Sequence, residues 1–521
     1  MKNRLSKALV LAVIVLFIGS GVISNIQSIN AIGMNNSNFN YCVKNNKSNT
    51  FLGNPPNEEW NKTYGGILFD NGYGVKQTSD GGYIIGSSKN ETGYYQGGDC
   101  WLIKTDKFGN IEWDKTFGGT ENDKGWTVQQ TKDGGYAVIG ATSSFGPGIL
   151  HDVYFIKTDI NGNKIWEKTY GYEDTIDAGL SFKETADGGY IIIGSWNTGF
   201  FGDAWLIKTD SNGNMIWNRT FGGADLEYGY SVQQTNDLGF IFTCLTYSYG
   251  AGNCDAWLIK TDSDGNMIWN KTFGGEGSDW CYSLIASDDG GYILVGTTES
   301  YGNNGDVWLV KTDVNGNELW NKTYGGNGFD HGNFLHQTND GGYIILGGTE
   351  SFGAGDEDFY LIKTDSLGNI KWDKTFGGIY QDRGYNVWQT MDGGYILSGL
   401  TYSYGAGESD VWLIKILPEE DEIFNIAIKG GFRVSSDIEN YGGTVAYDVL
   451  WSIDLDGGLI LAGEHTEGVI DELAPGAAKT IRQTTLYGIG MTTITVTAGD
   501  ATKQATGFIL GPFVLGVEEI S

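Results

Sequence analysis

The sequence predicts an all-β protein, with a seven-bladed β-propeller closed by an N-terminal strand and followed by a β-sandwich. Glycine is abundant, at 82 of 521 residues, whereas proline is scarce, at 6. Aromatic residues make up 13% of the chain, and a tryptophan motif recurs about every 52 residues. A repeat near 50 residues that contains four short strand patterns is typical of propeller blades. Glycine-rich turns and aromatic strands support the same all-β class.

Residues 1–31 are predicted to be a secretory signal peptide or an uncleaved N-terminal anchor. A basic start precedes an unbroken apolar run over Ala8–Ile18, and small residues follow it. That order is typical of export signals, and the run is short for a stable membrane span. The asparagine-rich residues 32–57 predict a linker without a core. We therefore expect a secreted or cell-surface protein that contacts a membrane only through this segment, if it stays uncleaved.

The repeat array, residues 58–417, predicts the propeller. Each repeat has a tryptophan followed by x-Lys/Arg-Thr-aromatic-Gly, and Asp-Gly and Gly-Asn turns supply the positive-φ positions that hairpins need. The first tryptophan strand, Glu58–Tyr64, lacks three strands before it, and the last repeat lacks its tryptophan strand. We expect these two ends to complete the seventh blade together, which removes two open sheet edges. The repeated residues are Trp60, Trp113, Trp166, Trp217, Trp269, Trp320 and Trp372.

The repeat resembles a known group of proteins. Asp203–Trp217 reads Asp-x-Trp-Leu-Ile-Lys-Thr-Asp-x-x-Gly-Asn-x-x-Trp, and this pattern resembles the blades of secreted prokaryotic repeat proteins. Those proteins are similar in fold to the PQQ-dehydrogenase-like and Kelch-like propellers. The resemblance implies the fold but no activity, because such motifs hold blades together in many unrelated propellers. No residue matches a quinone-contacting or metal-contacting motif.

Residues 422–517 predict a separate β-sandwich. Alternating strand patterns lie between glycine-rich turns, and there is no helical period. The stretch Ile438–Gly442, which leads to Val449–Ile453, resembles the Ig-like, CARDB-like adhesion modules of prokaryotic surface proteins. The resemblance implies an appended spacer or adhesion domain.

Charge and motif content exclude several functions. The chain has 64 acidic and 33 basic residues, a net charge of −31, which argues against binding nucleic acid or anionic lipid. The five cysteines lack CxxC spacing and the four histidines are scattered, so no zinc or thioredoxin-like site is expected. His331 and His336 are five residues apart and would face opposite sides of one regular strand. Without a G-x-S-x-G motif, nucleophilic catalysis finds no support.

One acidic residue lies just before the first strand of each blade. If that strand is innermost, the ring places seven acids near one mouth of the channel, where they would hold a hydrated divalent cation such as calcium. No other cofactor is expected. The alternative is that each acid accepts hydrogen bonds from its own connecting loop. The seven acids are Asp70, Asp123, Asp177, Glu227, Asp279, Asp330 and Asp382.

The loops between the second and third strands of the blades carry aromatic residues beside glycine. Function commonly lies on loops held by a rigid scaffold, so we expect these rings to stack on a glycan or to anchor a surface protein. The alternative is that they tuck between blades and cover the core. The residues are Tyr94, Tyr95, Phe145, Phe200, Phe201, Tyr249, Tyr301, Phe352 and Tyr404.

Four N-x-T sequences occupy one repeated position in the fourth strands. An exported chain in a glycosylating organism would carry sugars there. Other repeats have Asp or Glu at this position, which indicates instead that it simply tolerates short polar groups. The four residues are Asn61, Asn218, Asn270 and Asn321.

The favoured function is a non-catalytic extracellular or cell-surface binding or adhesion protein, with an extracellular glycan or a surface protein as partner. Seven near-equal blades favour it, because a single active site makes one or two blades diverge. The alternative is a glycan-active propeller enzyme, a glycosidase or a lyase. The acids that depart from the repeat on the loop side are Glu299, Glu350, Glu357 and Glu408.

Overall fold

The described part of the protein consists of strands and turns. The structure is a computed structural model that describes residues 55–90, 98–147, 151–197, 202–287, 289–419, 424–440, 446–474, 476–499 and 501–519. Within these ranges, no helix is long and apolar enough to cross a membrane. The predicted export segment at residues 1–31 and nearly all of the predicted linker lie outside the described residues.

Residues 58–416 form seven four-stranded antiparallel sheets, an all-β repeat pattern that is consistent with a propeller. The innermost strands are β2 (Asn71–Gln77), β6 (Asp123–Gln130), β10 (Ile176–Glu184), β14 (Glu227–Gln234), β18 (Asp279–Ala286), β22 (Asp330–Gln337) and β26 (Asp382–Gln389). The second strands are β3 (Tyr83–Asn90), β7 (Tyr136–Thr142), β11 (Tyr190–Asn197), β15 (Phe240–Thr246), β19 (Tyr292–Thr298), β23 (Tyr343–Thr349) and β27 (Tyr395–Thr401).

The third and fourth strands complete each sheet on its outer side. The third strands are β4 (Gly98–Thr105), β8 (Asp152–Thr158), β12 (Gly202–Thr209), β16 (Asp255–Thr261), β20 (Asp306–Thr312), β24 (Asp358–Thr364) and β28 (Asp410–Ile416). The fourth strands are β5 (Ile111–Phe117), β9 (Lys164–Tyr170), β13 (Met215–Phe221), β17 (Met267–Phe273), β21 (Glu318–Tyr324), β25 (Ile370–Phe376) and β1 (Glu58–Tyr64).

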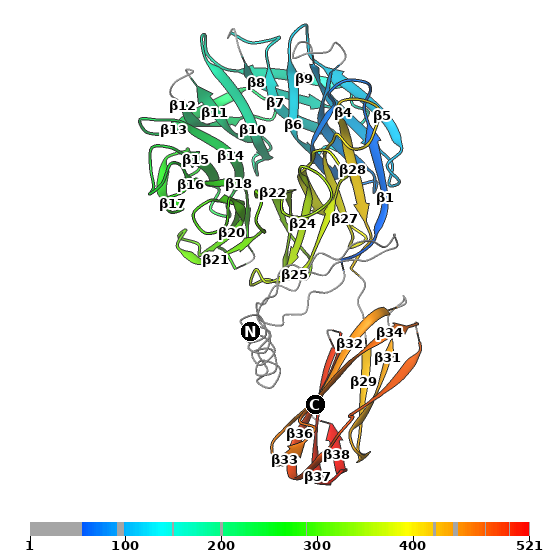
Figure 1. Ribbon diagram of the computed structural model, residues 1–521. Coiled ribbons are helices and arrows are strands. Elements are labelled where there is room, and N and C mark those ends of the chain that lie inside the picture. The colour runs from blue at the N-terminus through cyan, green and yellow to red at the C-terminus, as the bar shows by residue number, and fades with distance from the viewer. Residues whose placement is uncertain are drawn as a thin grey trace, which may run out of the picture. The chain divides into compact units, whose positions relative to one another are not determined.

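The seven innermost strands contact one another in cyclic order, from β2 through β26 and back to β2 (Figure 1). Strand β1 pairs with β28, so the N-terminal strand is the fourth strand of the last sheet, as predicted. Side chains at the ends of the innermost strands join neighbouring sheets. The side-chain amide oxygen of Gln77 accepts a hydrogen bond from the Met391 backbone N–H at 2.7 Å, and that of Gln130 accepts one from the Ser79 backbone N–H at 2.8 Å.

Apolar side chains from neighbouring sheets form the cores between them. In one such core, Ile193 and Leu206 of one sheet pack against Phe242 and Trp257 of the next, and all four are buried. Burial of each side chain of this size stabilises the folded state by about 1.5–3 kcal/mol. Each sheet therefore depends on both of its neighbours for burial.

A buried lysine joins the third strand of each sheet to a hairpin turn. In the fourth full repeat, Lys260 of β16 is buried and lies 2.8 Å from Asp237 of the Asn-Asp-Leu-Gly turn. The Lys260 ammonium also donates to the Thr261 carbonyl oxygen at 2.8 Å. Burial opposes the ionisation of Asp237, but hydrogen bonds from Lys260 and Thr235 lower its pKa to about 2. The seven lysines are Lys104, Lys157, Lys208, Lys260, Lys311, Lys363 and Lys415.

Every innermost strand contains a β-bulge. In β6 the register against β7 shifts between Gly125 and Thr127, which leaves Trp126 as an extra residue. A Cβ added at Gly125 would stand 2.5 Å from the Cys100 sulfur, so a close approach requires glycine there. We call the seven extra residues the bulge residues: Tyr73, Trp126, Leu180, Tyr230, Tyr282, Asn333 and Tyr385.

The C-terminal residues form two sheets that share one core. The smaller sheet has the order β29 (Phe424–Lys429), β31 (Ser435–Asn440), β35 (Ala478–Arg482). Ile438 of this sheet and Val496 of the larger one are both fully buried in the common core. The larger sheet comprises β30 (Gly431–Phe432), β38 (Phe513–Glu519), β37 (Ala501–Gly511), β36 (Tyr487–Ala498), β32 (Ala446–Asp456) and β34 (His465–Leu473), with β33 (Leu459–Ala462) beside β36.

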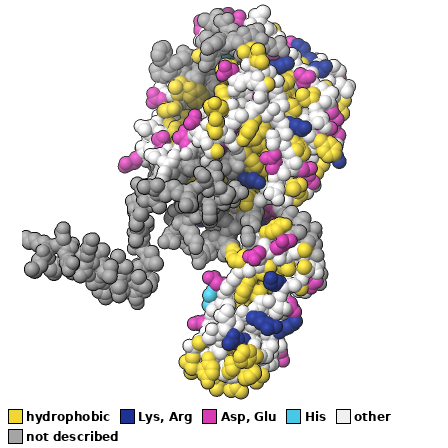
Figure 2. Space-filling model, turned by 45° about the vertical axis from the view of Figure 1, so that its right-hand side comes forward, with side chains coloured by type: hydrophobic (Ala, Val, Ile, Leu, Met, Phe, Trp, Pro, Cys, Tyr) yellow, Lys and Arg dark blue, Asp and Glu magenta, His cyan; other side chains and the backbone are white. Residues whose placement is uncertain are grey.

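One face of the larger C-terminal sheet carries exposed apolar side chains. Hydrophobic side chains gather at one end of this module (Figure 2). Met491 lies opposite Phe508, and Ile489 lies opposite Leu510, so the side chains form continuous rows across the strands. The exposed residues are Leu459, Leu461, Tyr487, Ile489, Met491, Phe508, Leu510, Phe513 and Leu515.

The lysine–aspartate pairs lead to a stability prediction. Asp237→Ala should destabilise the fold by about 1–3 kcal/mol, because it leaves the buried Lys260 ammonium without its carboxylate. Lys260→Met should destabilise the fold by less than Asp237→Ala does, because it removes the buried charge and retains an apolar side chain of similar length. Urea unfolding, with Asp264→Ala in an exposed neighbouring turn as the control, measures both changes. Equal losses for Asp237→Ala and Asp264→Ala would contradict the prediction.

Candidate functional site

The innermost strands surround a cavity of about 470 Å³, which we call the inner cavity. All seven innermost strands contribute lining residues, and all seven bulge residues are among them. Its volume suits one small-molecule ligand of ordinary size. Among the described residues that line it there is no aspartate or glutamate, although the chain as a whole is strongly acidic.

Aromatic rings and hydrogen-bonding groups share the wall of the inner cavity. The rings of Tyr73 and Tyr385 have centroids 5.2 Å apart, and those of Tyr230 and Tyr282 are 5.1 Å apart. Burial, followed by the neighbouring Tyr385, raises the pKa of Tyr73 to about 12, so its hydroxyl keeps its proton at neutral pH. The side chains of Gln129, Gln233, Asn333 and Asn386 line the same cavity. The wall therefore offers ring faces together with neutral donors and acceptors.

The penultimate residues of the innermost strands form a second layer, which we call the lysine layer. The Lys76 nitrogen lies 2.9 Å from the centroid of the Trp388 ring, and the His336 ring lies 4.5 Å from the same ring. Burial, together with the charge of Lys183, lowers the pKa of Lys76 to about 7. Burial lowers the pKa of Lys183 to about 8. The layer consists of Lys76, Gln129, Lys183, Gln233, Ile285, His336 and Trp388.

An ion pair between a buried carboxylate and a half-buried guanidinium lies near the start of β22 and β26. Arg383 donates to both carboxylate oxygens of Glu357, at 2.8 and 2.7 Å, and Gln381 donates to the same carboxylate at 2.7 Å. His331 Nε2 lies 3.4 Å from this carboxylate. Glu357 is one of the acids that depart from the repeat, and these contacts explain why it differs.

The bulge in β22 changes the predicted placement of its two histidines. The register shift between Gly332 and Phe334 inserts one residue between His331 and His336. His331 lines the inner cavity, and His336 contacts the cavity-lining Trp388. The expectation of opposite sides was wrong, because it assumed a strand without a bulge.

The seven acids proposed as a calcium ring are buried and hydrogen-bonded within the loops of the sheets. Asp279 accepts from the Gly275 backbone N–H at 2.8 Å and from the Ser300 hydroxyl at 2.6 Å, and Glu227 accepts from Gly223 at 2.9 Å. Among the described residues, no group of three or more His, Cys, Asp or Glu side chains is placed to hold a metal ion. These contacts match the alternative in which the acids organise their own loops, and calcium binding stays a prediction.

Each of these acids also faces a second carboxylate, from the third strand of the preceding sheet. A Cβ added at Gly377 would stand 1.8 Å from Asp358 Oδ1 and 3.0 Å from Asp382 Oδ2, so the two carboxylates lie within a few ångströms of each other. Burial and, more weakly, Asp382 raise the pKa of Asp358. The partners are Asp99–Asp123, Asp152–Asp177, Asp203–Glu227, Asp255–Asp279, Asp306–Asp330, Asp358–Asp382 and Asp410–Asp70.

The described loop aromatics are half-exposed, and each ring packs on an aromatic residue of its own sheet. Tyr249 lies 5.0 Å from Trp257, and its hydroxyl donates to the Gly222 carbonyl oxygen at 2.9 Å. The same arrangement occurs at Tyr301 and Tyr404. Phe145 and Phe352 stack on tyrosines instead. Tyr94, Tyr95, Phe200 and Phe201 lie outside the described residues.

Three of the four N-x-T asparagines, Asn61, Asn218 and Asn270, accept hydrogen bonds from third-strand tryptophans. The Trp257 indole N–H donates to the Asn270 side chain at 3.0 Å, and Trp205 donates to Asn218 at 3.2 Å. Trp101 donates to Asp114, which occupies the same position in another repeat. This shared role explains why the position is Asn, Asp or Glu, and glycosylation of Asn61, Asn218, Asn270 and Asn321 stays a prediction.

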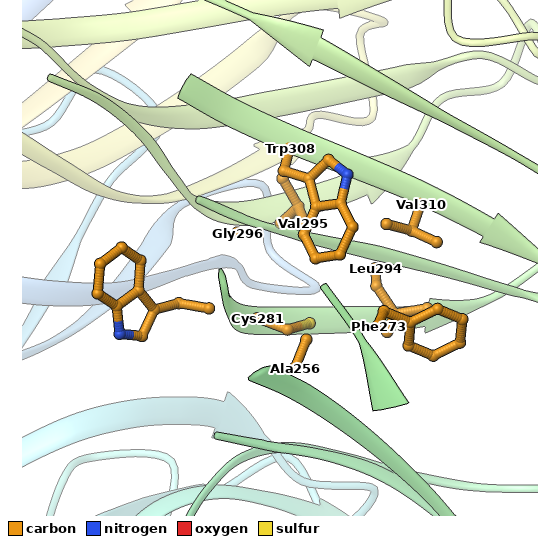
Figure 3. A pocket seen from close by; sticks show the side chains of 9 residues that line it. Ala256, Phe273, Cys281, Leu294, Val295, Gly296, Trp308 and Val310 are labelled. Carbon is orange, nitrogen blue, oxygen red and sulfur yellow. The ribbon is translucent and has the colours of Figure 1, made fainter. Parts of the chain in front are cut away.

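A second, apolar gap lies between two neighbouring sheets and has no room for a water molecule. Cys281, Leu294 and Trp308 point towards it (Figure 3). It is part of the core between sheets and not a binding site. Cys281 and the other described cysteines, Cys100, Cys244 and Cys254, are buried and free.

Comparison with known proteins does not assign a function. No protein-family model matches the chain, and no curated protein matches it. Similar solved structures include YCF48 bound to D1 peptide (10% identity, 70% of this chain and 98% of that chain, TM-score 0.41). Others are a protein of unknown function from Dyadobacter fermentans (9%, 69% and 99%, 0.40) and the polysaccharide lyase Uly1 (11%, 66% and 90%, 0.39). These similarities are too low to transfer a substrate or partner.

The facing carboxylates lead to a second prediction. Because the folded-state pKa of Asp358 is raised, its contribution to stability is present at low pH and is lost as pH rises through that pKa. Asp358→Asn should therefore raise the melting temperature at pH 8 and reduce its increase towards pH 5. Thermal melts at both pH values, with and without calcium, check this. The opposite result would be a lower melting temperature for Asp358→Asn than for the wild type at pH 8. If calcium also raised the melting temperature of the wild type but not that of the variant, a cation would lie between the carboxylates.

Proposed function

We propose that the chain is a non-catalytic extracellular or cell-surface binding protein, built on a seven-bladed propeller closed by β1 and followed by an Ig-like sandwich. The cyclic contacts of the innermost strands and the pairing of β1 with β28 support the closed propeller. Two sheets around one core support the sandwich. The basic and apolar start of the sequence supports export.

The ligand-binding site of this proposal is the inner cavity, and the ligand class is an extracellular glycan. The single observation that carries it is a cavity of about 470 Å³ whose wall combines aromatic faces with amide and hydroxyl groups. A sugar ring presents C–H groups that stack on aromatic faces and hydroxyl groups that need neutral donors and acceptors. The loop aromatics, by contrast, already pack on their own sheets.

The observations favour binding over glycoside hydrolysis. A glycosidase of the usual kind needs two carboxyl groups on either side of the scissile bond. No carboxylate is among the described residues lining the inner cavity. The nearby Glu357 is held by Arg383 and Gln381, and although burial opposes ionisation, the hydrogen bonds from Arg383 lower its pKa. A carboxylate with a lowered pKa is a poor general acid.

The proposal predicts that Trp126→Ala weakens glycan binding. A glycan array of the mature chain identifies the ligand, and calorimetry then measures affinity. Loss of a stacking ring in the cavity should cost about 2 kcal/mol or more. Prolonged incubation with the bound glycan should release neither reducing ends nor unsaturated products.

The control is a triple variant, Tyr249→Phe, Tyr301→Phe and Tyr404→Phe, which removes only the loop hydroxyls. It should bind as the wild type does. If the triple variant loses affinity while Trp126→Ala retains it, the ligand lies on the loop face and the inner-cavity proposal is wrong. Glycan cleavage would favour the enzyme.

A further inference from the structure

The charged side chains that line the inner cavity are all basic. They are Lys76, Lys183 and Arg383, in a chain whose net charge is −31. Arg383 is neutralised by Glu357 through two hydrogen bonds. Neither Lys76 nor Lys183 forms an ion pair with a carboxylate among the described residues, in contrast to the seven buried lysines of the third strands.

Lys76 and Lys183 come from different sheets, and both line the inner cavity. The charge of Lys183 acts on Lys76, and both act on His336. Lys76 Nζ lies over the face of Trp388, which attracts a cation but does not neutralise it. Two ammonium groups that repel each other in a partly desolvated cavity are stabilised when an anion binds between them.

No acid is among the described residues that line the inner cavity or among the members of the lysine layer. The titratable members of that layer besides Lys76 are Lys183 of β10 and His336 of β22. The other members of the layer, Gln129, Gln233, Ile285 and Trp388, are neutral. Burial, followed by the charges of Lys76 and Lys183, lowers the pKa of His336 to about 4, so it is neutral at pH 7. The local charge near neutral pH is therefore set by the two lysines.

We propose that Lys76 and Lys183 form an anion subsite that binds the carboxylate or sulfate ester of an acidic saccharide, with the sugar ring against the aromatic wall. This inference rests on the proposed function and specifies its ligand class. A charge-assisted hydrogen bond from each ammonium would recognise the anion, while the aromatic rings and amides contact the rest of the sugar. A neutral saccharide would leave the two ammonium groups unpaired.

Binding through this subsite depends on pH. Both lysines are charged below about pH 7, and Lys76 and then Lys183 lose their protons as pH rises through about 7 and 8. Affinity for an acidic saccharide should therefore be high at pH 6 and fall by about tenfold or more by pH 9. Affinity for a neutral saccharide should change little over the same range.

The experiment measures calorimetric affinities of the mature chain for tri-galacturonate, a sulfated oligosaccharide and neutral galactotriose at pH 6 and pH 9. The variants are Lys76→Met and Lys183→Met, and the matched control is Lys107→Met in an exposed turn. Each lysine variant should lose about tenfold or more in affinity for whichever acidic saccharide binds, whereas Lys107→Met should not. Melting temperatures should not fall, because each change removes a desolvated charge.

A second measurement does not require a glycan ligand. Reductive methylation at pH 7, read by mass spectrometry, should modify Lys76 and Lys183 faster than Lys107, and inorganic sulfate should protect the first two. Equal affinity for acidic and neutral saccharides, or unchanged affinity in both lysine variants, overturns the anion subsite and leaves the proposed function standing. Absence of all saccharide binding overturns the proposed function, and absence of sulfate protection then overturns the subsite as well.

Discussion

The β-bulge in each innermost strand is the constraint on which the site depends. Without it, strict alternation would turn only every second residue towards the centre. The bulge inserts one residue, beside a glycine in six of the strands and beside Cys281 in β18, so that a bulge residue and, further along, a residue such as Lys76 or Trp388 both reach the inner cavity. A close contact such as that of Gly125 with Cys100 then limits that position to a very small residue. The cavity wall is therefore a consequence of backbone geometry repeated in seven sheets.

Sequence reasoning predicted the strands well because turn and tryptophan motifs recur at nearly constant spacing. The predicted first tryptophan strand, Glu58–Tyr64, coincides with β1. The role of the lysine in the Lys-Thr-Asp motif was missed, because its partner, Asp237, lies on another turn and the pairing appears only once the hairpin register is known.

The inner cavity was not predicted. The sequence motifs consist of residues that the repeats share, whereas the cavity is lined by residues at positions where the repeats differ, such as Lys76, Gln129 and Trp388. The signal in the sequence that could have predicted the cavity was the variation among the repeats at one aligned position. The loop aromatics were predicted to bind a ligand because they recur in the repeats. Their recurrence reflects packing on third-strand rings such as Trp257. In this chain, shared residues support the sheets and variable residues shape the cavity.

The pairing of β1 with β28 has a consequence for biosynthesis. Trp60 lies opposite Lys415, and nearly the whole repeat array separates them along the chain. Contacts between such distant segments form late, because a long loop must close before they gain any stability. During synthesis from the N-terminus, β1 is made first and has no partner until the final repeat follows. The last sheet therefore cannot be completed before β28 has been synthesised, and a chain truncated before β28 would leave β1 unpaired.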